Sequence, residues 1–452
     1  MNASNRLDNS AADSAKPPAL ATQLQWVSHN VLGVEKGRSL AELLPQVPSA
    51  LRPGVQALTF EALRHLGTAR ALAKCLVQRA PAPPALALLH SALALLAGDE
   101  EAKRYAAHTL VDQAVEAAKH SRDTRMQAGF LNACLRRFLR ERPALMAQIE
   151  ADPVARWNHP LWWIQRVKTD HPDHWKAILA ANNVPGPMVL RVNRRKTTRD
   201  AYRARLAEAG MHASLLGIDG LLLAAPAPVD QLPGFAQGHV SVQDGSAQLA
   251  AQLLLADRAW SAAECVLDAC AAPGGKTAHL LECAEASVLA LDVDPLRCQR
   301  ISQNLQRLGL SATLKTGDAA LPSEWWDGHL FDAILLDAPC TASGIVRRHP
   351  DVRWLRRKSD VDQLAQLQAR LLDALWPVLK PGGRLVYATC SVFRAEGAEQ
   401  VRAFLARHTD ALERPSPGHL LPGSAPMAWD INDNVASGYD GFFYACLDKA
   451  NS

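Results

Sequence analysis

The feature that most limits the fold of this chain is the alternation of short apolar segments and helical segments from about residue 240 onward. Apolar strands are predicted at residues 265–267, 288–291, 333–336 and 384–387, and segments of helical length separate them. Such alternation predicts parallel strands joined by right-handed crossovers, that is, a doubly wound α/β domain over residues 239–452. Ligands of such domains bind at the carboxyl ends of the strands.

The first predicted strand runs into the sequence DACAAPGGKT at residues 268–277. Small residues and paired glycines let a ligand approach the backbone and leave amides exposed where the next helix begins. The segment has neither the Gly-x-Gly-x-x-Gly pattern nor the spacing of a phosphate loop, which disfavours NAD and ATP sites. A tight turn without a ligand is the alternative. Two later strands favour a ligand. Asp292 follows the second strand and can accept hydrogen bonds from ribose hydroxyls, and Asp318 follows a further candidate strand near Thr316, which is the third in chain order.

Two cysteines and an aspartate follow the last two predicted strands, as Asp337 and Cys340 after the fourth and Cys390 after the fifth. A thiolate is a suitable nucleophile for carbon 6 of a pyrimidine, and its addition makes carbon 5 able to accept a methyl group. A carboxyl group near N3 of a cytosine would stabilise the charge that develops on the ring. A single cysteine is more often a buried core residue, but this paired placement favours chemistry. The residues alone do not decide which cysteine is the nucleophile.

The N-terminal third has a different pattern, which predicts an all-α domain over residues 19–150. In the segment 127–141, apolar residues form two rows at helical spacing, and Arg136, Arg137 and Arg140 lie on the other side. This region is net basic, which suggests a polyanion as partner or simply a solvated surface. We further predict a disordered tail at 1–18, a Trp-rich linker at 151–185 whose Trp162 and Trp163 pack one domain on another, and a small α/β subdomain at 186–238.

The amino-acid composition is that of a globular protein and gives no sign of a zinc site, a signal peptide or a membrane span. Hydrophobic residues make up 48% and charged residues 21% of the chain, as in globular proteins. Nine cysteines occur without Cys-x-x-Cys spacing, so no zinc site is expected. The first twenty residues have no hydrophobic signal core and no apolar stretch reaches the length of a membrane span, so we expect a cytoplasmic protein.

Taken together, the motifs resemble those of the bacterial ribosomal RNA small subunit methyltransferase B family, within the S-adenosylmethionine-dependent RNA 5-methylcytosine methyltransferases. The resemblance covers residues 20–448. It depends on the segment 268–277, on LDAPC at 336–340 with GIVRRHPD at 344–351, on YATCS at 387–391 and on DGFF at 440–443. FLNACLRR at 130–137 resembles the signature helix of the NusB-type RNA-binding domain of this family. The resemblance implies a NusB-like helical domain, a small α/β subdomain and a Rossmann-like methyltransferase domain.

The resemblance also implies roles for individual residues. Cys390 would be the nucleophile, Cys340 would assist product release, and Asp337 would face the methionine end of S-adenosylmethionine and the target cytosine. The cofactor would be held by Cys270, Ala271, Ala272, Pro273, Gly274, Gly275, Lys276, Asp292, Asp318 and Asp337. RNA would contact Arg136 and Arg137 and, in the basic segment 347–358, Arg347, Arg348, Arg353 and Arg356.

The implied partner is 16S rRNA, naked or in an early assembly intermediate, and the implied enzyme is a monomer without a metal. Two alternatives stay open at this point. One is the same chemistry on tRNA, and the other is a non-catalytic NusB-like RNA-binding factor.

Overall fold

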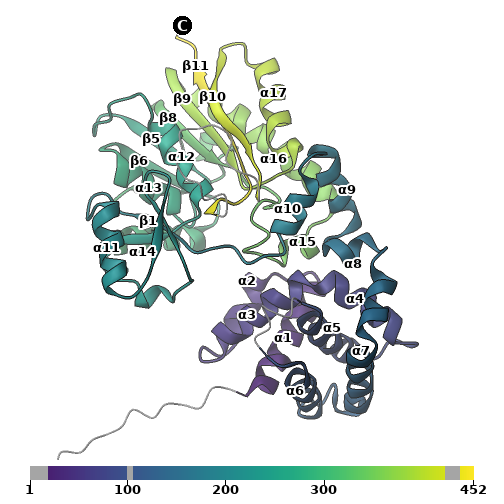
Figure 1. Ribbon diagram of the computed structural model, residues 1–452. Coiled ribbons are helices and arrows are strands. Elements are labelled where there is room, and N and C mark those ends of the chain that lie inside the picture. Colours follow the sequence, from purple (N-terminus) through teal and green to yellow (C-terminus); the bar gives the residue numbers. More distant parts are fainter. Residues whose placement is uncertain (1–18, 99–104, 423–437, 452) are drawn as a thin grey trace, which may run out of the picture. The chain divides into compact units, whose positions relative to one another are not determined.

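The computed structural model describes residues 19–98, 105–422 and 438–451 (Figure 1). The predicted tail at 1–18 lies outside these residues. The chain forms two compact units that meet in sequence between Arg156 and Trp157, and each is described by itself. Every helix in the described part is too short or too polar to span a membrane.

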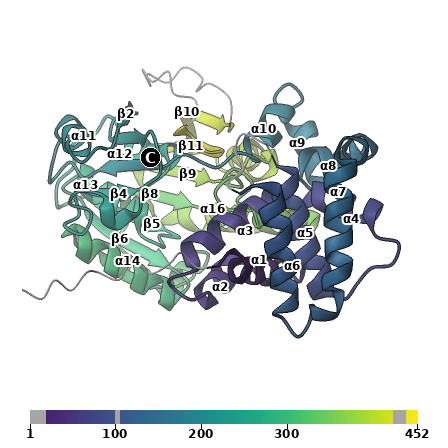
Figure 2. The ribbon, with the colours of Figure 1, turned by 60° about the horizontal axis from the view of Figure 1, so that its bottom comes forward.

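The first unit is entirely helical, as predicted. In its centre, α5 begins with two prolines, whose fixed φ suits a first helical turn, and its almost wholly apolar sequence packs against α1, α3 and α4 (Figure 2). The helices of this unit are α1 (Leu20–Glu35), α2 (Leu40–Leu43), α3 (Arg52–Arg64), α4 (Leu66–Leu76), α5 (Pro83–Ala97), α6 (Ala107–Lys119) and α7 (Ala128–Ile149), with the short 3-10 helices η1 (Leu44–Gln46) and η2 (Arg125–Gln127).

Helix α7 is the predicted segment 127–141 extended by two turns past Pro143. One face buries Leu131, Leu135 and Phe138 in the core of the unit. Arg136 and Arg137 project from the other face, where their side chains are 65% and 44% exposed. The amphipathic pattern therefore leaves these arginines on the surface of the first unit, where Arg137 pairs with Glu141 at 2.9 Å.

The predicted linker at 151–185 is instead helical, with α8 (Pro153–Trp157), α9 (Leu161–Asp170) and α10 (Trp175–Ala181). In the second unit, Trp163 is completely buried and its ring centroid lies 5.1 Å from that of Phe393, three residues after Cys390. Trp162 lies beside both rings. The paired tryptophans thus fix α9 to the loop that follows a predicted catalytic cysteine, which agrees with the packing role expected for them.

The small subdomain is a four-stranded antiparallel sheet in the order β2-β3-β1-β4 with one helix packed on it. The strands and the helix agree with the predicted α/β subdomain, but its last strand lies wholly beyond the predicted boundary at 238. The elements are β1 (Val189–Val192), α11 (Arg199–Glu208), β2 (Ala213–Leu216), β3 (Gly220–Leu223), the 3-10 helix η3 (Val229–Gln231) and β4 (Val240–Val242).

The catalytic domain contains a seven-stranded sheet in the order β10-β11-β9-β8-β5-β6-β7. The strands are β5 (Cys265–Ala269), β6 (Ser287–Asp292), β7 (Thr313–Thr316), β8 (Phe331–Asp337), β9 (Leu379–Thr389), β10 (Ala411–Leu420) and β11 (Phe442–Lys449). The five strands from β9 to β7 are parallel, as predicted. Two further strands that were not predicted, β10 and β11, add an antiparallel hairpin at one edge of the sheet.

Helices cover both faces of this sheet and complete the doubly wound fold (Figure 1). One face packs against α12 (Gly245–Leu255), α13 (Gly275–Cys283) and α14 (Pro295–Leu308). The other packs against α16 (Lys358–Leu375) and α17 (Ala398–Arg407). Shorter helices lie in the connections: η4 (Pro322–Glu324), α15 (Val352–Leu355), η5 (Trp376–Val378) and η6 (Arg394–Glu396).

Candidate active site

The turn between β5 and α13 has a backbone that few residues can adopt. Cys270 has φ 63°, the Ala272–Pro273 peptide is cis, and Gly274 has φ 92° at the start of α13. A Cβ on Gly274 would lie 3.0 Å from the Ile301 side chain, so both the positive φ and the close approach to α14 require glycine there. The turn leaves the beginning of α13 open towards the ends of the strands, as an anionic or polar ligand needs.

Asp268, the last acidic residue of β5, is fully buried beneath this turn. Its Oδ2 accepts a hydrogen bond of 2.6 Å from the Thr277 hydroxyl, whereas its Oδ1 is a buried acceptor with no hydrogen-bond partner. Burial raises the pKa of Asp268 to about 7, and the Thr277 hydrogen bond only partly opposes this. The end of β5 therefore holds a carboxyl group with spare capacity to accept a hydrogen bond.

Asp292 shapes the same turn from the end of β6. Its carboxylate is almost completely buried and accepts hydrogen bonds from the backbone N–H groups of Ala272 (3.0 Å) and Asp294 (3.1 Å). The Arg297 guanidinium lies 3.6 Å from Oδ1. Asp294 in turn caps α14 by accepting from the first backbone amides of that helix.

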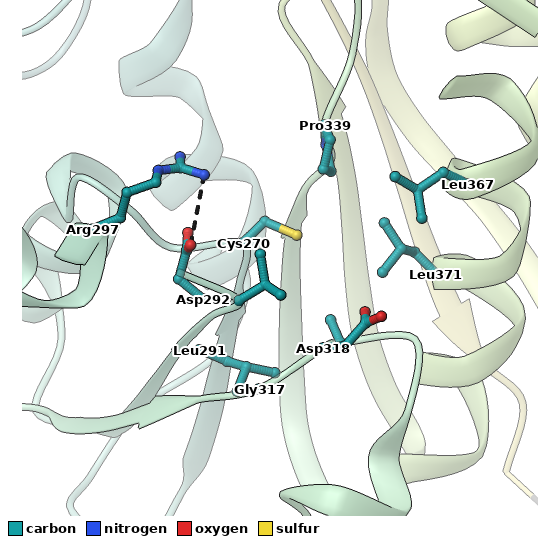
Figure 3. Close-up of a pocket in the computed structure, with 11 residues that line it drawn as sticks. Cys270, Leu291, Asp292, Arg297, Gly317, Asp318, Pro339, Leu367 and Leu371 are labelled. Atoms are coloured by element: carbon teal, nitrogen blue, oxygen red, sulfur yellow. Dashed lines mark ion pairs between the residues drawn. The ribbon is translucent and has the colours of Figure 1, made fainter. Parts of the chain in front are cut away.

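A pocket of about 170 Å³ lies where these strand ends meet (Figure 3). Three of the residues that the sequence analysis assigned to a cofactor, Cys270, Asp292 and Asp318, line it, and apolar side chains form most of the remaining wall. An apolar slot with carboxylates at its edge suits an adenosine group, whose base is flat and apolar and whose ribose hydroxyls donate hydrogen bonds. The other lining residues are Leu291, Val293, Arg297, Gly317, Ala319, Pro339, Leu367 and Leu371.

Lys276 connects the glycine turn to β8. Its Nζ lies 2.6 Å from Oδ2 of Asp337 and 5.5 Å from the centre of the Phe442 ring. Burial lowers the pKa of Lys276, but the Asp337 carboxylate outweighs this effect and the pKa is raised. Both groups are therefore held as an ion pair, and the Asp337 carboxylate is fixed in orientation.

Cys340 and Cys390, which follow the adjacent strands β8 and β9, lie together with their Sγ atoms 3.3 Å apart. The hydrogen bond with Cys390, together with burial, raises the pKa of Cys340 well above its ordinary value. The Cys390 carbonyl accepts from the Gly344 backbone, and Gly344 is so close to Gly441 that a Cβ on it would overlap the Gly441 carbonyl. Both thiols thus lie beyond the carboxyl ends of adjacent parallel strands, where the sequence pattern placed them.

Burial of Arg347 speaks against the prediction that it contacts RNA, and Arg348, also predicted to contact RNA, has partners within the protein. Arg347 is buried and pairs with Asp440, and Arg348 pairs with Asp440 and with Asp244, at 2.7 Å to the latter. Burial, with the neighbouring Asp440 charge, raises the pKa of Asp244 to about 6. These arginines tie the loop after Cys340 to the residues before β11, so their charges are already neutralised inside the protein.

Arg353 is also wrong as a predicted RNA contact, because its side chain is completely buried. Its guanidinium donates to the carbonyl oxygens of Asn158 (3.1 Å) and Asn182 (2.5 Å) and to Oδ1 of Asn183 (2.5 Å). Arg356 is half-buried and donates to the carbonyl oxygens of Thr341 (3.1 Å) and Cys340 (3.4 Å). The basic segment therefore holds the loop that carries Cys340.

The sequence analysis missed a buried connection between the small subdomain and the glycine turn. Arg191 of β1 makes a two-pronged ion pair with Glu282 of α13, both at 2.9 Å, and donates to the Gly275 carbonyl at 2.7 Å. Neither residue stands at a strand end of the large sheet, so no motif identified them. Leu367 and Leu371 of the pocket were missed for the same reason.

Among the described residues, one cluster has metal-ligand types close together: Asp219, His279 and Cys283. Both carboxylate oxygens of Asp219 already have partners, in Arg194 and in the His279 ring at 3.1 Å. Burial, with the Arg191 charge, lowers the pKa of His279 to about 4. The Asp219 carboxylate is therefore already held by an ion pair with Arg194 and a hydrogen bond with His279.

Comparison with known proteins agrees with this geometry. Residues 257–448 match the family model "16S rRNA methyltransferase RsmB/F", and residues 159–230 match the RsmF/B-like ferredoxin-like domain. The second match includes α9 and α10, so these two helices of the predicted linker fall within the matched ferredoxin-like domain. The crystal structure of PH0851 superimposes with a TM-score of 0.73 at 24% identity and covers 94% of this chain and 99% of that one. A methyltransferase homologue from Pyrococcus horikoshii gives a TM-score of 0.55 at 28% identity, over 66% and 98% of the two chains.

Similarity in sequence to curated proteins extends over both units. The chain is 42% identical to the ribosomal RNA small subunit methyltransferase B of Vibrio cholerae, over 92% of this chain and 94% of that protein. It is 44% identical to the protein of the same name from Cronobacter sakazakii, over 92% and 96%. With the glycine turn, the acidic strand ends and the cysteine pair in place, the chain belongs to the ribosomal RNA small subunit methyltransferase B family.

Proposed function

We propose that this protein methylates carbon 5 of a specific cytosine in 16S rRNA, with S-adenosylmethionine as the methyl donor. The observation that carries the proposal is the pair of thiols 3.3 Å apart, next to Pro339, which lines the pocket that also contains Asp292 and Asp318. A methyl donor in the pocket and a base over the thiols would then share one edge of the sheet.

In this proposal the residues from Cys270 to Lys276 form the cradle of the donor. Asp292 holds the ribose and Asp318 lies near the adenine, where the pocket carries both carboxylates. Asp268 has the unpartnered buried oxygen that a donor N–H group at the methionine end would satisfy. When bound, S-adenosylmethionine supplies the methyl group.

Cys390 is the proposed nucleophile and adds through its sulfur to carbon 6 of the cytosine, which makes carbon 5 nucleophilic towards the methyl group. After methylation, carbon 5 gives its proton to a water molecule. The electron pair left behind re-forms the double bond between carbons 5 and 6, and the Cys390 sulfur leaves carbon 6 as a thiolate. Cys340, whose raised pKa keeps it a thiol, lies at hydrogen-bond distance from Cys390 and assists that release. Asp337, oriented by Lys276, faces the base and stabilises charge on the ring.

The target cytosine has to leave its stack to reach the thiols, so the substrate is a single-stranded or loop cytosine in naked or early-assembly rRNA. The exposed Arg136 and Arg137 on α7 bind its phosphates. This proposal places the enzyme in the cytoplasm as a monomer that needs no metal.

Bisulfite sequencing of small-subunit rRNA from cells with and without this protein tests the proposal. One cytosine should be protected from conversion only when the protein is present. Protection found on tRNA instead would assign the same chemistry to another RNA. Binding without any protected cytosine would assign a non-catalytic RNA-binding role.

A further inference from the structure

Glu396 lies outside every motif of the sequence analysis, yet it contacts both segments that carry the cysteines. It belongs to η6, six residues after Cys390, and its side chain is completely buried. A carboxylate in such a position is costly unless hydrogen bonds compensate for its lost hydration. The hydrogen bonds of Glu396 therefore show which segments this buried group holds.

Glu396 accepts four hydrogen bonds from three residues. Its Oε1 accepts from the Thr341 backbone N–H at 2.8 Å and from Gln368 at 3.3 Å. Its Oε2 accepts from the hydroxyl groups of Thr341 at 2.5 Å and Ser391 at 2.6 Å. Thr341 directly follows Cys340 and Ser391 directly follows Cys390, so one carboxylate joins the two cysteine loops.

The Glu396 backbone reinforces the same connection. Its carbonyl oxygen accepts from the hydroxyl groups of Tyr387 (2.8 Å) and Thr389 (3.2 Å), both among the last residues of β9 before Cys390. On the opposite side, Gln368 also donates to the Pro339 carbonyl at 2.8 Å. Residues on both sides of each cysteine are thus fixed to Glu396 or to its partner Gln368.

We infer that Glu396 is a positioning residue that ties the Cys340 loop to the Cys390 turn and thereby sets the separation of the two thiols. This inference rests on the proposed function for the meaning of that separation, because release by Cys340 requires it to stay within reach of Cys390. Burial raises the pKa of Glu396 and the Ser391 and Thr341 hydrogen bonds oppose the rise, as expected of a carboxylate held by donors.

A cross-linking rate measures the separation without RNA, methyl donor or turnover. Diamide, a two-electron oxidant, takes two electrons and two protons from a pair of thiols and is reduced to the hydrazine, while the sulfurs form a disulfide. Formation of the bond at about 2.05 Å requires only a small approach from 3.3 Å. Mass spectrometry of non-reduced peptides follows the Cys340–Cys390 product in the full-length protein.

Glu396→Ala should slow this cross-link about 100-fold, the scale expected for a displacement of about 1 Å, and should lower kcat with little change in the KM for S-adenosylmethionine. Glu396→Gln should restore both, because its amide can still accept from the Thr341 backbone and donate to the two hydroxyl oxygens. Asp332→Ala is the matched control: that carboxylate also bridges two segments, Cys265 N–H and Lys380 at 2.8 Å each, but at the other end of β8. Its cross-linking rate should equal that of the wild type.

A wild-type cross-linking rate in Glu396→Ala would overturn the inference. A Glu396→Gln variant as slow as Glu396→Ala would also overturn it, because the negative charge of Glu396, and not its hydrogen bonds, would then control the cross-linking rate. If Glu396→Ala does not fold, Thr341→Val removes one of the bridging hydroxyls at nearly constant volume and should slow the cross-link. A wild-type rate in Thr341→Val would then overturn the inference. Failure of methyl transfer to rRNA in the wild-type protein would instead overturn the proposed function and leave the cross-linking result unaffected.

Discussion

Cys340 and Cys390 are 50 residues apart in the chain, and their Sγ atoms lie 3.3 Å apart beyond the ends of two paired parallel strands. At that distance one thiol can exchange a proton with the other, or with a base bound to it, without movement of the backbone. This hydrogen bond with Cys390, together with burial, raises the pKa of Cys340 well above its ordinary value.

Replacement of each cysteine should therefore block a different step of the reaction. Cys390→Ala should abolish methyl transfer and leave no covalent RNA adduct, because the attacking sulfur is absent. Cys340→Ala should still allow attack and methylation but stall the release step. It should accumulate a protein–RNA complex that survives denaturing gel electrophoresis.

Trapping with 5-fluorocytosine-substituted RNA provides the control for this assignment, since fluorine at carbon 5 blocks the final proton loss. The wild-type protein should be captured through Cys390. A peptide map that places the RNA on Cys340, or a stable adduct in Cys390→Ala, would reverse the two roles.

Asp292→Ala should weaken S-adenosylmethionine binding, because charge-assisted hydrogen bonds to the ribose are worth about 1.5–3 kcal/mol each. The variant also frees the Ala272 N–H that Asp292 holds in the glycine turn. Titration calorimetry measures the affinity. Asp294→Ala serves as the control, because Asp294 caps α14 from the adjacent position and does not line the pocket. Equal affinities for the wild type and Asp292→Ala would exclude this carboxylate as a ribose ligand.

Asp268 should make the stability of the second unit depend on pH. Its pKa is about 7 when folded and about 3.9 when unfolded. The folded protein therefore binds more protons between these values, and the free energy of unfolding falls as the pH rises through that window. Asp268→Asn removes this dependence. Its stability relative to the wild type should improve by up to about 4 kcal/mol between about pH 4 and pH 7 and then stay constant.

Urea unfolding followed by tryptophan fluorescence measures this difference, because every Trp except Trp26 lies in the second unit. An unpaired amide in Asp268→Asn adds a constant offset of about 1–3 kcal/mol, so the change with pH decides the matter. Parallel pH curves for the two proteins would mean that Asp268 is ionised normally in the folded state.

Substitutions of arginines in the two units should have different effects: those in the first unit should weaken RNA binding, and that of Arg353 in the second unit should lower stability. Replacement of both Arg136 and Arg137 by Gln should weaken rRNA binding and reduce the salt slope by about one for each phosphate that the protein no longer neutralises. Filter binding at several salt concentrations measures the slope, and Arg38→Gln, also exposed in the first unit, should leave it unchanged. An unaltered slope in the double variant would remove α7 from the RNA-binding surface.

Arg353→Met should instead destabilise the second unit by about 3 kcal/mol or more, because the carbonyls of Asn158 and Asn182 lose a charged donor inside the protein. The variant that remains folded should bind rRNA with the wild-type salt slope. Urea unfolding and filter binding on the same preparation distinguish the two effects, and a lower slope without loss of stability would restore Arg353 as an RNA contact.

The parts of the fold that the sequence predicted are those where local pattern and final environment agree. Residues 265–267 and 333–336 are apolar runs in central parallel strands covered on both faces, and the structure contains them within β5 and β8. Strand β10 was not predicted because its sequence, ALERPSPGHL, contains two prolines and a glycine. An edge strand tolerates these residues, whereas they disfavour any prediction of a strand from sequence.

The residues of the site also fall into two groups, those that the local sequence predicted and those that it did not. Asp292 ends β6, Cys340 lies three residues after β8 and Cys390 directly follows β9, so a prediction of these strands also predicted where the three residues lie. Glu396 and Arg353 act through contacts with residues distant in sequence, and nothing in their neighbours distinguishes a buried guanidinium from a solvated one. Sequence composition therefore assigned the basic segment to RNA, while tertiary packing assigns its buried members to the protein interior.

The close approach of Gly344 to Gly441 has a consequence for biosynthesis. A ribosome makes the glycine turn and both cysteines well before β11, whose first residue follows Gly441 and which pairs with β9. The Gly441 N–H bonded to the Gly344 carbonyl, and Asp440 bonded to Arg347, are then still missing. The contacts that join the Cys340 loop and β9 to β11 can therefore form only after residues 440–449 have been made, so this side of the site is completed late in translation.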